Sequence, residues 1–433
     1  MKKILIFGAG KSATSLIEYL CKECDENNWM LVVCDSNLLM AQSKINNCKN
    51  AKAISIDVID AQQRISLITE SDIVISMLPH HLHFLVAGDC VDAGKNLLTA
   101  SYVDGEIRKL EKQIKQNNLL FLCEMGLDPG IDHMSAMKMI NEIKSKGGKI
   151  ISFKSHCGGL ISPESDNNPW HYKITWNPGN IVMAGSSGAI YKLGGVTKEI
   201  SYHKIFLDCE TVDVPALFPL AWYPNRDSLS YISTYGLEDA DTFIRTTLRH
   251  PSFCDGWNKI VHTGLTDVND YDEIKNCKTY NDWYQLKGKT QRPLLNNINI
   301  SDKNYDEQLT YLGLRSNNKI EMPIKNSAQL LQNILEKKLA VQPHDKDMIV
   351  MLHEIAYIYN NERKEIRSCL IVKGEDAKHT AMSKTVGLPL GIAAKLILLE
   401  KIKLTGLHIP VLPEVYERVL AELEKNQIKF NEA

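Results

Sequence analysis

The start of the chain places the strongest constraint on the fold. The largely apolar run Lys3–Phe7 is followed directly by the segment GAGKSA (residues 8–13) and then by a helical pattern. In this G-x-G-x-x-A spacing the first glycine makes a tight turn and the second lets the backbone approach a pyrophosphate. The small third residue lets the helix pack closely on the strand. We therefore expect a Rossmann-type, doubly wound α/β domain that binds a dinucleotide at a helix N-terminus; a glycine-rich structural turn is the alternative.

The rest of the sequence extends this expectation to a parallel sheet and a second, mixed sheet. Apolar runs alternate with helical patterns up to about Glu124, as in βαβ units. From about Met125 to Gly236 the pattern is typical of strands in an open sheet, and 239–340 is more helical and polar. A hairpin is expected from Met348 to Lys373, with its turn at Asn360–Arg363, and helices are expected at Leu390–Leu399 and Glu414–Asn426. The strands expected in the first zone are Lys3–Phe7, Trp29–Cys34, Asp72–Met77, Asn96–Ala100 and Leu119–Cys123.

Charge and cysteine content exclude several classes of protein. The 50 Lys and Arg residues nearly balance 52 Asp and Glu residues, for a net charge of −2, which argues against a nucleic-acid-binding surface. We expect no membrane span, because no stretch approaches about 18 apolar residues. The 11 cysteines are expected to be reduced thiols in a cytoplasmic protein. No metal site is expected, since Cys21-x-x-Cys24 lacks a second pair and the histidines of HHLH (residues 80–83) lack Cys or carboxylate partners.

Residues at the ends of the expected strands predict how a dinucleotide would bind. Asp35 ends the second strand, where a carboxylate accepts from the ribose 2′-hydroxyl of NAD and repels the 2′-phosphate of NADP. We therefore expect NAD rather than NADP; the alternative is that Asp35 only caps the next helix. Asp57 and Val58 follow the third strand, near the adenine, and Leu78 and Pro79 follow the fourth, near the nicotinamide. The cofactor-binding residues expected from this pattern are Gly8, Gly10, Lys11, Ser12, Ala13, Asp35, Ser36, Asp57, Val58, Leu78 and Pro79.

Longer motifs narrow the prediction beyond dinucleotide binding. The chain resembles the saccharopine dehydrogenase (L-glutamate-forming) family of lysine metabolism, and the likeness extends in order over nearly its whole length. The motifs that carry it, besides GAGKSA, are TASYV (99–103), EMGLDPGIDH (124–133), CGGL (157–160), YKITW (172–176), YPNRDS (223–228), TLR (247–249), KDMIV (346–350) and MSKTVGLP (382–389).

The resemblance implies an NAD(P)-dependent oxidoreductase that interconverts saccharopine with L-glutamate and 2-aminoadipate 6-semialdehyde. It implies that Asp128, Cys157 and Tyr102 orient the substrate and assist proton transfer. Cys157 would either shuttle a proton or be a small group that tolerates close approach. The implied substrate-binding residues are Ser101, Tyr102, Asp128, Arg226, Thr247, Leu248 and Arg249, and the further cofactor-binding residues are Ser101, Leu127, Asp128, Pro129 and Asn177.

Some of these residues have simpler interpretations. Arg226 stands next to Asp227, so the residues alone would favour a structural ion pair. Asp132 and His133 open a helix and are expected to be structural. His156 stands where the family usually has Tyr, and a titratable imidazole at this position would alter pH dependence.

The resemblance also implies the division of the chain. The Rossmann domain would comprise 1–128 with 386–433, the substrate-binding and dimerisation domain 129–238 with 341–385, and a mainly helical insertion 239–340. A small substrate would bind between the domains of a homodimer, with no nucleic acid or membrane as partner. Two alternatives stay open: a carboxy(nor)spermidine-type dehydrogenase, whose pocket should hold more carboxylates and fewer arginines, and a non-catalytic NAD-binding protein.

Overall fold

The computed structural model describes residues 1–46, 48–290 and 302–432, which form two compact units. The first unit comprises residues 1–148 and 378–430, and the second comprises 149–377 and 431–433. Residues 239–340, expected as a separate insertion, lie within the second unit, and 291–301 lie outside the described residues. The three-part division therefore stays a prediction.

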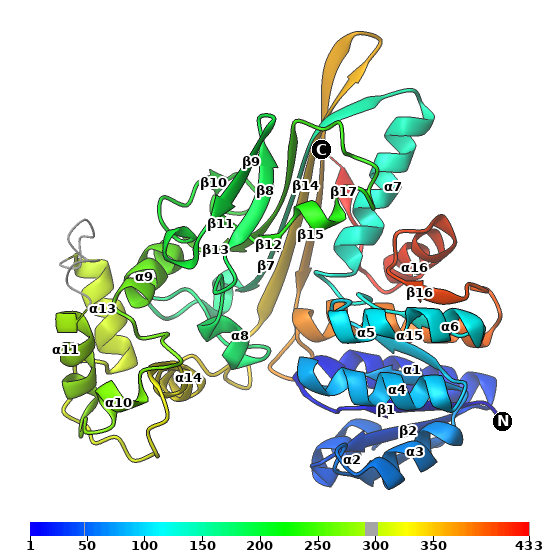
Figure 1. Cartoon of the computed structure of the whole chain (residues 1–433), viewed down its shortest axis with the longest axis horizontal. Helices are drawn as coiled ribbons and strands as arrows, with labels where there is room; N and C mark the ends of the chain where they lie inside the picture. Colours follow the sequence, from blue (N-terminus) through cyan, green and yellow to red (C-terminus); the bar gives the residue numbers. More distant parts are fainter. Residues whose placement is uncertain (47, 291–301, 433) are drawn as a thin grey trace. The chain divides into compact units, whose positions relative to one another are not determined.

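The first unit is built on a parallel sheet whose described strands have the order β16-β6-β5-β4-β1-β2-β3 (Figure 1). This is the expected doubly wound sheet: the order reverses between β1 and β4, and in sheets of this kind ligands bind at the carboxyl ends of the strands beside that reversal. The strands are β1 (Lys3–Phe7), β2 (Met30–Asp35), β3 (Ala51–Ser55), β4 (Ile73–Ser76), β5 (Asn96–Thr99), β6 (Leu120–Leu122) and β16 (Gly406–His408).

Helices surround this sheet, and the last part of the chain supplies two of the helices of this unit, α15 and α16. The α-helices of the unit are α1 (Thr14–Asn27), α2 (Leu38–Ile45), α3 (Ala61–Thr69), α4 (His83–Asp92), α5 (Gly105–Lys109), α6 (Glu111–Gln116), α7 (Ile131–Ser145), α15 (Ala381–Leu398) and α16 (Pro413–Lys425). α15 packs on α1 at Gly387, where a Cβ atom would lie 2.8 Å from the backbone nitrogen of Leu16. Glycine is therefore required for this close approach of the two helices.

Two features of α15 differ from expectation. The helix begins nine residues before the predicted Leu390, because the Thr380 side chain caps it by accepting from Ser383 N at 2.9 Å. Contrary to expectation, its 18 residues are also long and apolar enough for a membrane span, but 78% of them are buried within the protein. Such burial is typical of a core helix.

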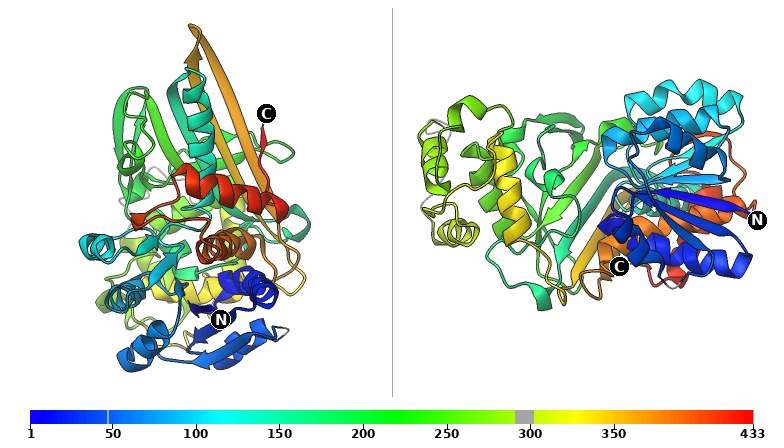
Figure 2. Two further views of the ribbon diagram at one scale, coloured as in Figure 1. Left: turned by 90° about the vertical axis from the view of Figure 1, so that its right-hand side faces the viewer. Right: turned by 90° about the horizontal axis from the view of Figure 1, so that it is seen from below.

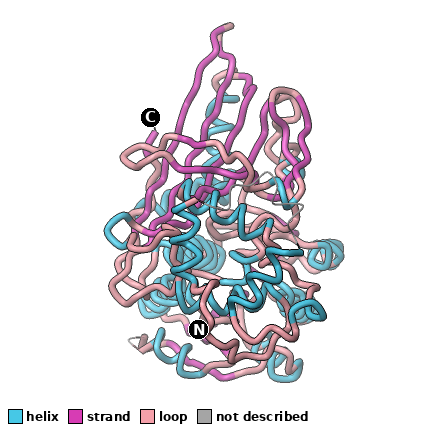
Figure 3. Tube along the Cα trace, turned by 90° about the vertical axis from the view of Figure 1, so that its left-hand side faces the viewer, coloured by secondary structure: helices cyan, strands magenta, loops and turns pink. Residues whose placement is uncertain are grey.

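The second unit is built on a mixed sheet of ten described strands (Figures 1 and 3). Its central strand β7 (Lys149–Ile161) pairs parallel with β13 (Thr242–Arg249) and antiparallel with β14 (Asp347–Tyr359). The other strands are β8 (Ala189–Leu193), β9 (Val196–Ile200), β10 (Thr211–Val212), β11 (Leu220–Pro224), β12 (Arg226–Asp227), β15 (Glu362–Lys373) and β17 (Asn431–Glu432). The predicted fold class, a Rossmann-type sheet with a mixed sheet and helices, is confirmed.

β14 and β15 form the expected hairpin, the long orange pair in Figures 1 and 2. The turn is shorter than predicted: Tyr359 pairs with Glu362, so only Asn360 and Asn361 connect the strands. Both have positive φ, 51° and 60°. Two-residue turns of this kind match the strand twist, and Asn tolerates the left-handed conformation that they need.

Helices of the second unit enclose a core of aromatic residues. They are α8 (Pro178–Val182), α9 (Pro251–His262), α10 (Tyr271–Ile274), α11 (Tyr280–Thr290), α13 (Lys303–Leu312) and α14 (Ser327–Lys338). Trp170, Trp257 and Trp283 are fully buried in this core.

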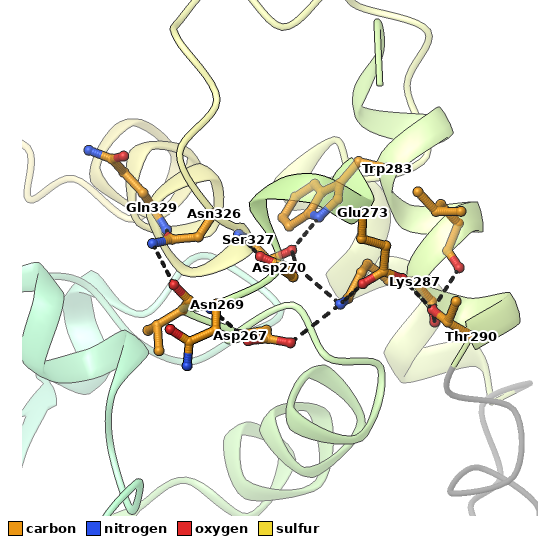
Figure 4. Close-up of polar contacts among 12 residues, drawn as sticks. Asp267, Asn269, Asp270, Glu273, Trp283, Lys287, Thr290, Asn326, Ser327 and Gln329 are labelled. Carbon is orange, nitrogen blue, oxygen red and sulfur yellow. Dashed lines mark hydrogen bonds and ion pairs between the residues drawn. The ribbon is translucent and has the colours of Figure 1, made fainter. Parts of the chain in front are cut away.

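A buried cation joins α10 and α11 (Figure 4). The Lys287 side chain is fully buried, and its Nζ lies 3.0 Å from Asp270 Oδ2, 2.9 Å from Glu273 Oε2 and 3.6 Å from Asp267 Oδ2. Asp270 also accepts hydrogen bonds from the backbone nitrogen and hydroxyl of Ser327, the first residue of α14. Burial lowers the pKa of Lys287, but hydrogen bonds to Glu273 and Asp270 outweigh it and the pKa is raised. The lysine therefore stays charged.

Candidate functional site

In the first unit, the glycine-rich segment forms the turn that its spacing predicts. Gly8 has φ 100°, and a Cβ atom there would lie 2.8 Å from the carbonyl oxygen of Met77. A Cβ at Gly10, by contrast, would meet nothing within 4 Å. A short 3₁₀ turn, Lys11–Ala13, leads directly into α1. The first glycine is thus required by the fold, and the second leaves the backbone open where a pyrophosphate would approach a helix N-terminus.

Asp35 ends β2 with its carboxylate turned toward the glycine-rich turn. Its Oδ2 accepts from Ala9 N at 2.7 Å and its Oδ1 accepts from Asn37 N at 2.8 Å. Each carboxylate oxygen keeps a further lone pair for a ribose hydroxyl. The helix-capping alternative does not describe this residue, because Asn37, not Asp35, caps α2 by accepting from Met40 N.

One cation lies close to this carboxylate. The ammonium group of Lys44 contacts the carbonyl oxygen of Gly10. Burial lowers the pKa of Lys44 to about 8, although the charge of Asp35 opposes that shift. The glycine-rich turn thus has a carboxylate, Asp35, and an amine of lowered pKa, Lys44, beside it.

Most of the other expected cofactor residues lie in loops of this unit, whereas Asn177 belongs to the second unit. Ser36, Asp57 and Val58 follow β2 and β3, whereas Leu78 and Pro79 follow β4. The chain segments Ser101–Tyr102 and Leu127–Pro129 follow β5 and β6. Because all these strands are parallel, the loops lie at one edge of the sheet. Tyr102 and Asp128 are half-buried.

A buried polar network supports the loop that carries Asp128. Glu124 Oε1 accepts from Val103 N at 3.1 Å, and its Oε2 lies 2.8 Å from His133 Nε2. Asp132 Oδ1 accepts from Gly130 N at 2.6 Å. Asp132 and His133, expected to be structural, thus hold the backbone of this loop, together with Glu124, which the sequence interpretation did not single out.

His83 is a second residue that the sequence interpretation left unused. In the sequence it belongs to the histidine-rich segment 80–83, and among the described residues no group of three or more His, Cys, Asp or Glu is placed to hold a metal ion. Instead, its Nδ1 lies 2.8 Å from Ser76 Oγ and its Nε2 lies 2.6 Å from Ser101 Oγ. No local pattern predicts this contact, because the three residues are brought together only by the ends of β4 and β5 and the start of α4.

In the second unit, one face of the central strands gathers several expected substrate residues. Cys157 on β7 pairs with Thr247 on β13, which pairs with Tyr223 on β11. Arg249 lies two residues beyond Thr247 and therefore points to the same face. Gly158 permits this packing, since a Cβ atom there would lie 2.5 Å from the carbonyl oxygen of Leu248.

Arg249 is the most unusual group of this face. Only 5% of the residue is exposed, and its Nε has no hydrogen-bond partner. Its Nη1 donates to Leu248 O at 2.8 Å, and the guanidinium lies 5.2 Å from the centre of the Tyr172 ring. In the described part of the chain it forms no ion pair with a carboxylate. The ionisable groups acting on it most strongly are the phenols of Tyr223 and Tyr172 and the thiols of Cys254 and Cys157.

Arg226 lies apart from Arg249. It is exposed, has φ 52° and stands two residues beyond Pro224, which pairs with Thr246. At 3.3–3.4 Å per residue, the two arginine backbones are roughly 15 Å apart along the strand. The two arginine side chains therefore start from well-separated positions on the backbone.

Three further residues have positions that the sequence could not establish. Leu248 points to the opposite face of the sheet from Cys157, so only its backbone can serve the site. His156 also faces that side, where its ring lies 2.7 Å from Thr246 Oγ1 and 3.2 Å from Glu354 Oε2. Burial lowers the pKa of His156. Asn177 caps α8 by accepting from Gly179 N at 2.9 Å.

Comparison with known proteins shows similarity over the whole chain. Residues 4–122 match the model of the saccharopine dehydrogenase NADP binding domain, and 126–428 match that of the saccharopine dehydrogenase C-terminal domain. The chain is 30% identical to the saccharopine dehydrogenase [NADP(+), L-glutamate-forming] of Saccharomyces cerevisiae, covering 98% of this chain and 97% of the relative.

Two further comparisons concern a longer relative and a solved structure. The chain is 32% identical to the alpha-aminoadipic semialdehyde synthase of Arabidopsis thaliana over 99% of its length, but it spans only 44% of that protein. The solved structure of apo saccharopine dehydrogenase (L-Glu forming) from S. cerevisiae superposes with a TM-score of 0.89 and is 28% identical, covering 100% of this chain and 99% of the other.

Proposed function

The chain belongs to the saccharopine dehydrogenase family, and we propose that it interconverts saccharopine with L-glutamate and 2-aminoadipate 6-semialdehyde. A bound nicotinamide dinucleotide would supply the hydride acceptor for the C–H bond beside the secondary amine. Water then hydrolyses the C=N bond of the resulting imine, releasing the amine of glutamate and the aldehyde. The chain itself must bind three carboxylates, orient the reacting carbon and handle protons.

Arg249 carries this proposal. Burying a guanidinium without a counter-charge costs several kcal/mol, and a substrate carboxylate would compensate that cost with two parallel hydrogen bonds. The unpartnered Nε supports such a ligand. A carboxylated polyamine would need anions for its additional amines, whereas the strongest ionisable neighbours of Arg249 are phenols and thiols.

Other expected site residues, from both units, suit the remaining requirements. Cys157 on β7 pairs with Thr247 on β13, and it is near enough to Arg249 for the two groups to interact electrostatically. We assign to Cys157, Asp128 and Tyr102 the orientation of substrate and the transfer of protons. Arg226, far from Arg249 along the strands, would bind a different carboxylate of the same substrate.

The test is turnover by the purified protein. NAD(P) reduction is expected with saccharopine, and NADH or NADPH oxidation with glutamate plus the semialdehyde. Absence of turnover with both nicotinamide cofactors in both directions would exclude the proposal and leave a dinucleotide-binding protein without this activity.

For the cofactor, we propose NAD over NADP. Asp35 places a carboxylate at the end of β2, where it would repel a 2′-phosphate, although the fungal relative's name specifies NADP(+). The kcat/KM values for the two cofactors at saturating saccharopine decide between them. Asp35→Ser should shift the ratio toward NADP. A tenfold preference of the unaltered protein for NADP would contradict the proposal.

A cytoplasmic location and a homodimer are also proposed. The open sheet of the second unit offers strand edges and a face through which a second copy could pair. Light scattering after size exclusion should give the mass of two chains; a mass of one chain would contradict the dimer. Fluorescence microscopy of the tagged full-length protein tests its location, and an organellar signal would contradict the cytoplasmic assignment.

A further inference from the structure

We propose that His83 is a positioning residue of the oxidoreductase: its imidazole fixes the Ser101 hydroxyl, so that this hydroxyl presents a defined hydrogen-bonding partner to ligands at the nicotinamide end of the dinucleotide site. The inference rests on the proposed function.

The geometry starts from three residues at one edge of the parallel sheet. Ser76 is the last residue of β4, His83 is the first residue of α4, and Ser101 lies two residues beyond the end of β5. In a doubly wound sheet the half built on β4 and β5 faces the nicotinamide, while β2 and β3 face the adenine. The three side chains therefore lie on the side of the sheet where the hydride is transferred.

The imidazole lies between two hydroxyl groups. His83 Nδ1 is 2.8 Å from Ser76 Oγ, and His83 Nε2 is 2.6 Å from Ser101 Oγ. Only 3% of His83 and 1% of Ser76 are exposed, whereas Ser101 is half-buried. Of these three hydrogen-bonded residues, Ser101 is therefore the one that solvent or a ligand can reach.

The protonation state of His83 determines which groups donate and which accept in these two hydrogen bonds. Burial, reinforced by His80 and His81 and opposed by Asp104, lowers the pKa of His83 to about 4. The neutral ring has one N–H and one acceptor nitrogen, so one serine donates to it and the other accepts from it. The tautomer of His83 therefore decides whether the Ser101 hydroxyl can still donate a hydrogen bond to a ligand or is restricted to accepting one.

The backbone of Ser101 is held independently. Its carbonyl oxygen accepts from Glu124 N at 3.0 Å, and its N donates to Thr99 Oγ1 at 3.2 Å. The position of Ser101 is therefore set by the strand ends. What remains for His83 is the rotamer of the side chain and the direction of its hydrogen bond.

A double-mutant cycle tests the inference. In saccharopine oxidation, His83→Leu and Ser101→Ala are each expected to lower kcat/KM by about tenfold or more. Because His83 acts through Ser101, His83→Leu should have little further effect in the Ser101→Ala background. His83→Gln, whose amide can reach the place of Nε2, should restore most of the activity.

Controls separate positioning from loss of stability. Val86→Ala removes apolar volume from a fully buried position of the same helix α4 without touching Ser101. It should lower the urea midpoint while leaving kcat/KM close to that of the unaltered protein. Additive effects of His83→Leu and Ser101→Ala, or a His83→Leu variant that loses only stability, would overturn the inference.

The same variants remain informative if saccharopine is not a substrate. The NADH dissociation constant, measured by fluorescence, and the ¹⁵N chemical shifts of the His83 ring report the contact without turnover. Ser101→Ala is expected to change the His83 tautomer signal, and the NADH dissociation constant should be non-additive in the same cycle. An unchanged His83 signal together with additive NADH affinities would exclude the positioning role, even if turnover itself fails.

Discussion

At the scale of single residues, the most informative feature is a charge that lacks its counterpart. In the sequence, only the three-residue motif TLR pointed to Arg249. The structure shows that this residue is buried, that its Nε has no hydrogen-bond partner among the described residues, and that its guanidinium lies against the Tyr172 ring. Lys cannot replace the planar fork of Arg at such a site.

Substitution of Arg249 should therefore separate substrate binding from cofactor binding. Arg249→Lys is expected to raise the KM for saccharopine by tenfold or more, since a bidentate charged contact contributes about 1.5–3 kcal/mol. The dissociation constant for NADH should change little. Arg245→Lys, on the same strand, is the matched control. A normal KM in Arg249→Lys would contradict the carboxylate assignment.

Histidine burial predicts a dependence of stability on pH. The pKa of His83 is lowered to about 4 by burial. The unfolded chain therefore binds more protons than the folded chain between about pH 4 and pH 6.5. The stabilisation is fully present above pH 6.5 and is lost as pH falls toward 4, amounting to about 3 kcal/mol. Burial and the neighbouring His171 also lower the pKa of His250 to about 4. His250 therefore changes the stability in the same direction.

The measurement is urea unfolding from pH 7.5 to pH 4.5. His83→Gln lacks the titrating ring, so its free energy of unfolding should fall less steeply with acid than that of the unaltered protein. Carboxylates contribute equally to both proteins and cancel in the comparison. Identical slopes in the two proteins would show that His83 does not titrate as described.

At the scale of secondary-structure elements, short polar contacts determine where helices begin and how they associate. Thr380 starts α15 well before its apolar stretch, and Asn360 with Asn361 sets the register of the β14–β15 hairpin. In the helical part of the second unit, Lys287 brings carboxylates of α10 and of the segment before it to α11.

Removing this cation should destabilise the second unit. Lys287→Met leaves Asp270 and Glu273 without their counter-charge, and breaking a buried ion pair in this way typically costs about 3–5 kcal/mol. Urea unfolding should show the loss, with NADH affinity unchanged. The control is Lys275→Met, which breaks an exposed pair with Asp272 and should have little effect. Equal effects of the two substitutions would show that the buried cluster is not stabilising.

At the scale of the whole molecule, the proposed site residues are divided between the two units. The proposed dinucleotide-binding residues from Gly8 to Pro129 belong to the first unit, whereas Asn177 and the proposed substrate residues Cys157, Arg226 and Arg249 belong to the second. The chain crosses from one unit to the other and returns, so neither unit is a continuous stretch of sequence.

Hydrogen exchange should show which unit binds the cofactor and which binds the substrate. NADH alone, at 100 times its dissociation constant, is expected to stabilise the protein by about 2.7 kcal/mol and to slow exchange around residues 8–13 and 35–37. Saccharopine added with NADH should slow exchange in β13. Protection by NADH confined to the second unit would contradict the assignment of the dinucleotide site.

How much of this the sequence determined depends on the range of the interactions. Local patterns were sufficient for the strand, glycine-rich turn and helix at residues 3–27, because steric limits on the backbone and apolar periodicity act within a few residues. The order of the longer motifs along the chain was sufficient to identify the family. The NAD preference and the roles of Asp128, Tyr102 and Arg226 remain predictions.

The tertiary structure decided what depends on residues distant in sequence. It placed Leu248 and His156 on the face opposite Cys157, because side chains alternate along a strand and only the pairing register tells which face a residue shares. It buried Arg249 without an ion pair to any carboxylate of the described residues, and it placed His83 between Ser76 and Ser101. Burial and hydrogen-bond partners are set by packing between elements far apart in the chain, so no local pattern in the sequence could reveal them.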